Sequence, residues 1–192
     1  MGVALKVEDL IASTNHPIVS SNCISILQRA REEAFKLGKT PLVEPTHFVS
    51  SMLALPLGGY GGTILRGHLT TTNVLQLRQM LSENDWRYDF RVRDGLITLE
   101  DLEFLDELFD QIHSQRTYED AVYSSLIDQV FEKAQEIAKK LGREDEVGSG
   151  EVLAAVLDVC KDDLRVKLLV KNCGGITSQN VINELRKSYR RN

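Results

Sequence analysis

No apolar run in this sequence is long enough to cross a bilayer, because charged or polar residues interrupt every hydrophobic stretch before the roughly 20 residues that a transmembrane helix requires. We expect no secretory leader in this sequence, since Lys6, Glu8 and Asp9 stand where such a signal needs an uninterrupted apolar segment. Basic character is also lacking: the net charge is −5, whereas nucleic-acid-binding domains carry an excess of Lys and Arg. We therefore expect a cytoplasmic protein that contacts neither membrane nor nucleic acid.

Residues for metal or redox chemistry are few. The three cysteines, Cys23, Cys160 and Cys173, are far apart and form no C-x-x-C pair, so we expect reduced, buried thiols rather than a disulfide scaffold. The four histidines form no pair at the helical spacing of metal ligands. The sequence thus predicts no metal and no cofactor, and it leaves one catalytic alternative open, a Cys–His pair that meets only in the fold.

Two local patterns fall short of ligand-binding motifs. The glycine run at 58–62 lacks the Gly-Lys-Ser/Thr ending of a phosphate-binding loop, and we interpret it as a flexible turn between helices. The segment after Asp94 resembles half of a calcium-binding EF-hand loop. However, Phe90 and Val92 would then stand at the first and third ligand positions, and neither can coordinate calcium. We expect no catalytic residues, and a protein that is not an enzyme.

What the sequence does contain is an internal repeat. Residues 19–53 align without a gap with residues 123–157, at a constant offset of 104, and the apolar positions coincide. After a shift of three residues, 70–74 also matches 177–181. Small residues and helix-ending glycines coincide too: Ala30, Ala34 and Gly38 with Ala134, Ala138 and Gly142. Agreement of cap, core and stop residues in one order indicates two copies of one structural unit.

Each unit is predicted to form four helices. In the first unit, Ser20 or Ser21 can cap a helix whose apolar residues recur at three- and four-residue spacing as far as Gly38, which ends it. A loop that contains Pro41 and Pro45 follows. The remaining helices of this unit are expected over about 46–55, 63–67 and 71–81.

The segment between the two copies differs from the rest in charge. Residues 83–120 hold twelve Asp and Glu against four Arg, a net of −8 in a chain of −5. Alternating residues on either side of Asp94-Gly95 predict a small β-hairpin, and an acidic helix is expected over 99–113. Its acids form either a solvated face or a dock for a basic partner, which would consist of Glu103, Asp106, Glu107 and Asp110.

With the two units defined, a resemblance to a known family becomes visible. Residues 30–38, Ala-Arg-Glu-Glu-Ala-Phe-Lys-Leu-Gly, resemble the first helix of the Clp N-terminal repeat, which forms the N-domain of the Clp/heat-shock AAA+ unfoldases. Residues 44–48, Glu-Pro-Thr-His-Phe, are similar to the family motif that opens the second helix, and 147–153 is a diverged copy of it. The resemblance covers residues 19–81 and 123–187.

The resemblance implies an all-α fold in which two tandem, pseudo-symmetric four-helix repeats form one domain. The chain then divides into an N-terminal extension (1–18), repeat 1 (19–81), an acidic inter-repeat insertion (82–122) and repeat 2 (123–192). It also implies a non-catalytic domain that binds adaptors or substrate proteins for a Clp-type ATP-dependent unfoldase or protease; no Walker motif for ATP occurs. The alternative is a stand-alone accessory or inhibitory subunit that docks on the Clp machinery or sequesters its ligands.

Some Clp N-domains bind phosphorylated arginine at two symmetric sites, each with a helix-capping Thr and a Glu. The capping positions match Ser20 and Ser124, but the Glu positions match Thr46 and Gly150, which removes both carboxylates that would hold a guanidinium. We therefore do not expect phosphoarginine recognition of that form. The ligand- or protein-binding residues that the resemblance indicates are Ser20, Glu44, Thr46, His47, Ser124 and Glu151.

Overall fold

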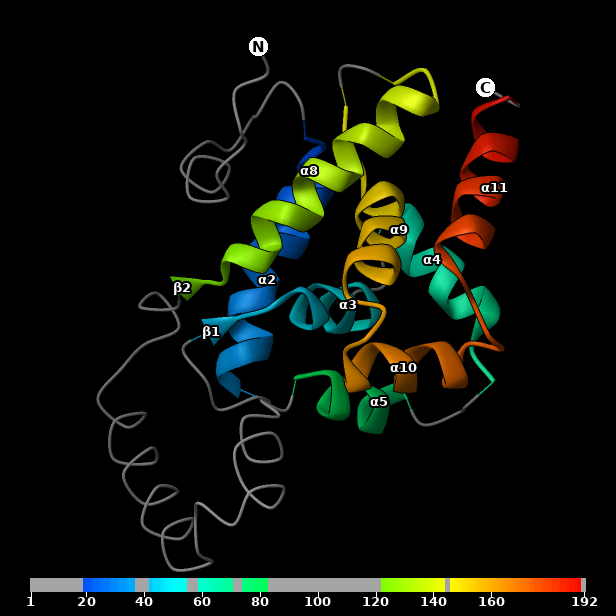
Figure 1. Ribbon diagram of the computed structural model, residues 1–192. Coiled ribbons are helices and arrows are strands. Elements are labelled where there is room, and N and C mark those ends of the chain that lie inside the picture. Colours follow the sequence, from blue (N-terminus) through cyan, green and yellow to red (C-terminus); the bar gives the residue numbers. More distant parts are fainter. Residues whose placement is uncertain are drawn as a thin grey trace, which may run out of the picture.

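The computed structural model describes residues 19–36, 42–54, 59–70, 74–82, 122–143 and 146–190. Its first half consists of α2 (Ser21–Lys36), β1 (Leu42–Val43), α3 (Pro45–Ala54), α4 (Gly59–His68) and α5 (Val74–Ser82). The second half consists of β2 (Val122–Tyr123), α8 (Ser125–Lys140), α9 (Ser149–Val159), α10 (Leu164–Asn172) and α11 (Ser178–Tyr189). Helices dominate the described part and the two strands are two residues long, so the all-α prediction is confirmed (Figure 1).

Each half contains four described helices in the same order, and the offset of 104 residues relates their starts to within one residue. It continues through the fourth helices, where the buried Leu77 and Leu81 of α5 match the buried Val181 and Leu185 of α11. The three-residue shift inferred for this region was therefore wrong. Similar polar residues before the helices suggested the shift, whereas the core positions keep the original register.

The longest helices form where the sequence predicted them. In α8, apolar residues recur at three- and four-residue spacing and all face inward. Ser124 precedes the helix in an extended conformation, and Gly142 follows it with φ of 76°, a conformation that glycine adopts without strain. The buried face of α8 consists of Ile127, Val130, Phe131, Ala134, Ile137 and Ala138.

The two halves are joined by short stretches of paired backbone that the sequence did not predict. β1 and β2 are parallel neighbours, with Val43 opposite Tyr123, and an isolated parallel bridge joins Val19 to Val147. The offset of 104 turns one pair into the other, because Val43 corresponds to Val147 and Val19 corresponds to Tyr123. Contacts related by a twofold axis behave in this way. Each half therefore contributes one segment to each pair.

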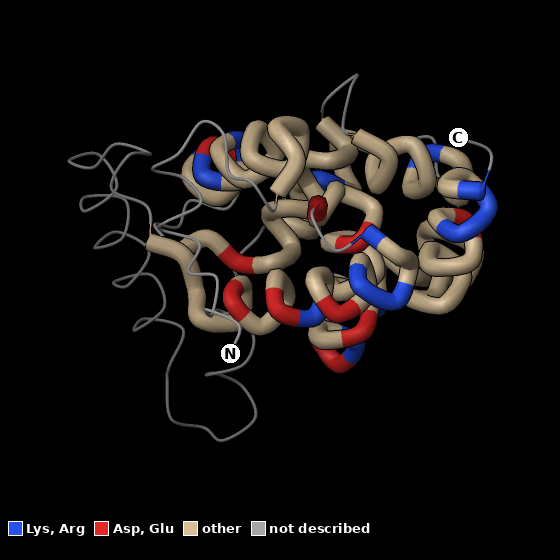
Figure 2. The backbone as a smooth tube through the Cα atoms, turned by 90° about the horizontal axis from the view of Figure 1, so that it is seen from above, with Lys and Arg blue, Asp and Glu red and all other residues tan. Residues whose placement is uncertain are grey.

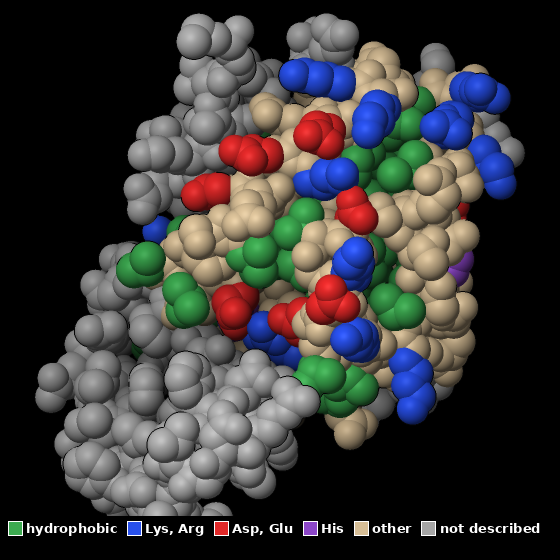
Figure 3. Space-filling view, in the orientation of Figure 1, with side chains coloured by type: hydrophobic (Ala, Val, Ile, Leu, Met, Phe, Trp, Pro, Cys, Tyr) green, Lys and Arg blue, Asp and Glu red, His purple; other side chains and the backbone are tan. Residues whose placement is uncertain are grey.

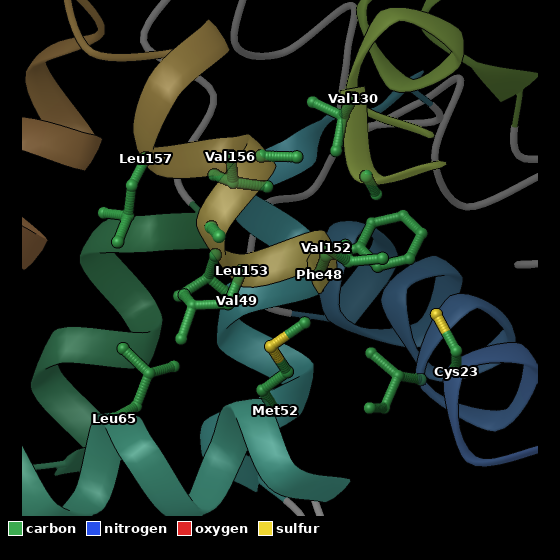
Figure 4. Packing of buried hydrophobic residues seen from close by; sticks show 14 of the residues in the cluster. Cys23, Phe48, Val49, Met52, Leu65, Val130, Val152, Leu153, Val156 and Leu157 are labelled. Carbon is green, nitrogen blue, oxygen red and sulfur yellow. The ribbon is translucent and has the colours of Figure 1, made fainter. Parts of the chain in front are cut away.

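The hydrophobic core lies between the halves and centres on α3 and α9 (Figure 4). Phe48 of α3 meets Phe131 of α8 edge to face, with ring centroids 5.8 Å apart, an arrangement that aromatic pairs favour. Ala30 and Ala134, predicted to mark close helix contacts, are both fully buried. One core therefore serves both halves.

Several sequence expectations concern residues outside the described part: the N-terminal extension (1–18), the hairpin around Asp94 and the acidic helix with Glu103, Asp106, Glu107 and Asp110. Within the described part, no single helix is long and apolar enough to span a membrane, and the pair α3 and α4, which passes together, is bent by 80°. Lys and Arg gather at the C-terminal end of the chain, where Arg186 and Lys187 occupy the last turn of α11 (Figure 2). Cations there are favourable beside the negative end of the helix dipole.

Candidate functional site

The site residues expected from the sequence lie at two places where the N-terminal ends of three helices meet. At the first, which we call the α3 junction, α8 and α10 approach the start of α3. The Ser124 N–H donates to the Val43 carbonyl (2.9 Å), and the guanidinium of Arg165, in the first turn of α10, donates to the Glu44 carboxylate (2.8 Å). The α3 junction thus contains four of the expected residues: Glu44, Thr46, His47 and Ser124.

The second place, the α9 junction, joins the starts of α9, α2 and α4. The Ser20 N–H donates to the Val147 carbonyl (3.0 Å), and the Gly61 N–H in the first turn of α4 donates to the Ser149 hydroxyl (3.0 Å). The α9 junction contains the remaining two expected residues, Ser20 and Glu151. Each junction combines both halves of the chain. At the α3 junction, Ser124 comes from the second half and α3 from the first; at the α9 junction, Ser20 comes from the first half and α9 from the second.

The glycine run belongs to α4 from Gly59 onward, so the interpretation as a flexible turn was wrong. A Cβ atom at Gly61 would lie 2.5 Å from the Ser149 carbonyl oxygen, and one at Gly62 would lie 2.6 Å from the Met52 carbonyl oxygen. Both distances are too short for any side chain. These glycines therefore allow the backbone of α4 to pack directly on α9 and α3, a role that local sequence cannot distinguish from a turn.

His47 and Glu151 occupy equivalent positions, third in α3 and third in α9, and both side chains are buried. Nδ1 of His47 accepts the Glu44 N–H (2.9 Å), and Oε2 of Glu151 accepts the Gly148 N–H (3.1 Å). Each side chain thus satisfies a backbone donor that the helix start leaves free, as in a capping box. In this conformation both residues support the fold, and a partner cannot reach them.

The environment of His47 keeps its imidazole neutral. Burial lowers the pKa of His47 to about 4, against the smaller opposing effect of its bond to the Ser82 carbonyl. With Nδ1 accepting from Glu44, the ring carries its proton on Nε2, which donates to that carbonyl (3.0 Å). The ring therefore joins the start of α3 to the end of α5.

Glu151 joins a different pair of elements. Its Oε1 accepts the Tyr189 hydroxyl (2.6 Å), and the Arg143 guanidinium lies over the Tyr189 ring, 4.6 Å from the centroid. Burial and the Glu151 carboxylate both raise the pKa of Tyr189, so its hydroxyl stays a donor. The start of α9 is thereby fixed to the last turn of α11.

The hydroxyl groups at the junctions differ in their partners. Ser20 Oγ accepts the Cys23 N–H (3.3 Å) and caps α2, which decides between Ser20 and Ser21. Among the described side chains, Thr46 Oγ1 and Ser124 Oγ are buried atoms with no hydrogen-bond partner. At Gly150, the counterpart of Thr46, a Cβ atom would lie 2.5 Å from the Leu185 side chain, which would have to move to admit any side chain there.

Sequence reasoning missed Arg165, which is the most heavily bonded residue of the α3 junction. Its guanidinium is 8% exposed and bonds to both Asp163 (2.8 Å) and Glu44 (2.8 Å). Burial alone would lower the pKa of Arg165, but the two carboxylates raise it above its usual value. Burial alone would raise the pKa of Asp163, but the contact with Arg165 holds that pKa below its usual value. One signal in the sequence could have identified Arg165. It is a charged residue in an inward-facing turn, at the position equivalent to Gly61.

A second missed feature is a buried polar cluster beside the α3 junction. Glu33 of α2 accepts from the Ser50 hydroxyl (2.6 Å) and from Arg78 (2.8 Å), and the Ser82 hydroxyl donates to Ser50 (3.0 Å). The equivalents of Glu33 and Ser50 are Ile137 and Ala154, both buried. The fold does not require this cluster, which fixes Ser82, the last residue of α5.

Each junction carries one exposed apolar residue at its edge. Tyr60, second in α4, is 39% exposed, and Leu164, first in α10, is 56% exposed; they are equivalent under the offset of 104. On the face shown in Figure 3, apolar side chains also reach the surface at the two strands, where Leu42 lies opposite Val122. Exposed apolar groups next to polar, partly buried ones are typical of protein contacts.

Metal-binding and thiol chemistry find little support here. In the described ranges, no group of three or more His, Cys, Asp and Glu residues could hold a metal ion. Cys23, Cys160 and Cys173 are buried and unpaired, and burial raises the pKa of each thiol, to about 12 for Cys160 and about 11 for Cys173. A thiol that stays protonated is a poor nucleophile.

Comparisons with known proteins bear on the fold. No protein-family model and no curated protein matches the sequence. Among solved structures, the crystal structure of the N-terminal domain of the caseinolytic protease-associated chaperone ClpD from Arabidopsis thaliana is similar. It is 16% identical, with a TM-score of 0.53, and the match covers 91% of this chain and 95% of the other. The chain therefore has a Clp N-terminal domain-like fold.

Proposed function

We propose that the chain is a non-catalytic protein-recognition domain that binds adaptors or substrate proteins for a Clp-type ATP-dependent unfoldase or protease. The observation that carries this proposal is the shared fold, since the match spans almost the whole of both chains. Fold alone does not determine function, so the surface must also suit a protein partner. The two junctions meet that requirement.

The junctions offer two equivalent contact surfaces. Tyr60 and Leu164 supply exposed apolar groups at their edges, while Ser20, Ser124 and Glu44 are partly exposed beside them. Interface energy concentrates in a few apolar anchors surrounded by polar groups. The buried His47 and Glu151 then act only by holding the helix starts in place. Thr46 is buried beside His47, and its hydroxyl has no hydrogen-bond partner among the described residues.

A binding measurement with matched variants tests the proposal. The probes are the Clp-type unfoldase of the source organism, purified, and a fluorescently labelled, chemically unfolded model protein. The variant Tyr60→Ser/Leu164→Ser is expected to weaken binding of at least one probe by about tenfold or more, as the loss of two anchors implies. The control is Leu75→Ser, which removes a side chain that is 62% exposed on α5. Failure of both probes to bind the unmodified chain would contradict the proposal.

The alternative role, an accessory or inhibitory subunit, is favoured by the −8 charge of residues 83–120. An acidic surface attracts a basic partner electrostatically, and this attraction weakens as salt screens the charges. Deletion of 83–120, or the change of Glu103, Asp106, Glu107 and Asp110 to Gln or Asn, distinguishes the two roles. If the insertion binds the partner, these variants lose association with the partner, and the salt dependence of that association is lost as well. If the junctions bind the partner, the association persists in these variants.

A further inference from the structure

The α3 and α9 junctions are held by different kinds of contact. At the α9 junction, Gly61 and Gly62 bring the backbone of α4 against that of α9 and α3. At the equivalent positions α10 carries Arg165 and Val166. The Arg165 guanidinium bonds to Glu44, the residue before α3, and so links α10 to the start of α3.

The two kinds of contact differ in how readily they separate. Burying charges costs several kcal/mol per ion, and this cost is recovered when the charges return to water. Separation of α10 from α3 rehydrates the charges of Arg165, Asp163 and Glu44. Separation of α4 from α9 exposes tightly packed backbone and the buried Ile64 and Leu65, and no buried charge of α4 is rehydrated in return.

The ends of α10 are also held unequally. Its C-terminal end is fixed by Thr70, whose N–H (2.9 Å) and hydroxyl (2.8 Å) both donate to the Asn172 carbonyl. Gly174 and Gly175 follow with φ of 60° and 79°, and the Gly175 N–H donates to the Val170 carbonyl (2.9 Å), which ends the helix. The N-terminal end is linked to the start of α3 through Arg165. The fully buried apolar residues of the helix are Val166 and Leu169, and Val170 is partly buried against the core.

We infer that α10 is a latched helix: it opens from its N-terminal end by local unfolding, while the equivalent helix α4 stays closed, and the Arg165–Glu44 ion pair is the latch. Opening uncovers Val166 and Leu169 together with the start of α3. Proteins open locally where few apolar contacts are buried and where the polar groups can be hydrated by solvent. This inference concerns the fold and holds whether or not the junctions bind a partner.

Hydrogen–deuterium exchange read by mass spectrometry tests the inference on the unmodified protein. Amides in α10 are expected to show protection factors at least about tenfold lower than amides in α4, as local opening predicts. The two helices are similar in length, so helix length does not explain such a difference. Equal protection in both helices would overturn the inference.

The variant Glu44→Gln tests the latch itself, since it removes the charge and keeps the side-chain size and the backbone N–H that caps α3. Protection should fall further in α10 and remain unchanged in α4. The control is Glu146→Gln, which removes a half-exposed carboxylate that pairs with Arg143 within the second half. Unchanged exchange in α10, or an equal loss in both helices, would show that the ion pair is no latch. If the variant does not fold, the comparison of α10 with α4 in the unmodified protein decides.

Discussion

At the scale of single residues, equivalent positions in the two halves bond to a free backbone N–H at a helix start with different side chains. The start of α3 and the start of α9 each leave a backbone N–H free, and the third residue of each helix accepts it. His47 does so with an uncharged ring, and Glu151 does so with a carboxylate. The buried, uncharged imidazole therefore adds a pH-dependent contribution to the stability of the first half.

We expect His47 to make the protein less stable as pH falls from about 6.5 to about 4. Burial holds the pKa of His47 at about 4 in the folded protein, against 6.5 for an ordinary His. Between these values the unfolded chain binds more protons, so the free energy of unfolding decreases with falling pH, by on the order of 3 kcal/mol in total. Above pH 6.5 the contribution is complete.

Urea unfolding across this pH range checks the prediction. His47→Gln is the control, because Gln can accept the Glu44 N–H without titrating. The difference in unfolding free energy between protein and variant should narrow as the pH falls towards 4. A constant difference would mean that His47 does not titrate differently in the two states.

Loss of Arg165 should be costly, because it leaves two carboxylates close together at the α3 junction. We expect Arg165→Met to lower the free energy of unfolding by about 3 kcal/mol, the lower end for a broken buried pair, since Glu44 and Asp163 remain partly exposed. Chemical denaturation measures this effect. Lys167→Met, at a 54% exposed side chain of the same helix, is the control and should change little. Equal effects of the two substitutions would contradict the assignment of Arg165 as a structural link.

At the scale of elements, the packing of α4 depends on the absence of side chains at its first turn. Gly61→Ala should destabilise the protein by about 1–3 kcal/mol, because the added Cβ atom would overlap the Ser149 carbonyl oxygen. Gly67→Ala in the same helix is the matched control: its Cβ atom meets nothing within 4 Å, and Ala at an exposed helical site stabilises by about 0.5–1 kcal/mol. Thermal unfolding should therefore show shifts of opposite sign, and two shifts of the same sign would contradict the close approach of α4 and α9.

The elements also show how far the sequence could predict the structure. α2 and α8 were predicted because their apolar spacing, caps and stop residues agree locally. The start of α4 was missed, since only the approach of α9 and α3 explains glycine at Gly61 and Gly62. β1 and β2 were missed because two residues carry no periodic signal and each strand finds its partner in the other half.

The candidate site was predicted only in part, for a similar reason. The family resemblance located Glu44, His47 and Glu151, but it could not show that the last two are buried caps. Arg165 and Glu33 were missed because a charged residue in an amphipathic helix usually faces solvent, and a buried partner is invisible in sequence. The division into repeats and the cytoplasmic location stay predictions.

At the scale of the whole molecule, one core serves both halves, so equivalent core changes should have equivalent effects. Ala30 and Ala134 are fully buried at matching positions of α2 and α8. Ala30→Leu and Ala134→Leu should each overpack the core and cost about 1–3 kcal/mol, seen as a lower denaturation midpoint. An unchanged midpoint for either variant would show that its helix can move away from the core without loss.

The reciprocal backbone pairing between the halves bears on how such a chain could arise. Val43 pairs with Tyr123 and Val19 with Val147, so each half of the chain completes the backbone pairing of the other. A lone ancestral repeat would have left both segments unpaired unless two copies exchanged them, as in a domain-swapped homodimer. Joining two such copies in one chain would make that association intramolecular, with a high effective concentration. The two copies could then differ at equivalent positions, as Arg165 and Gly61 do.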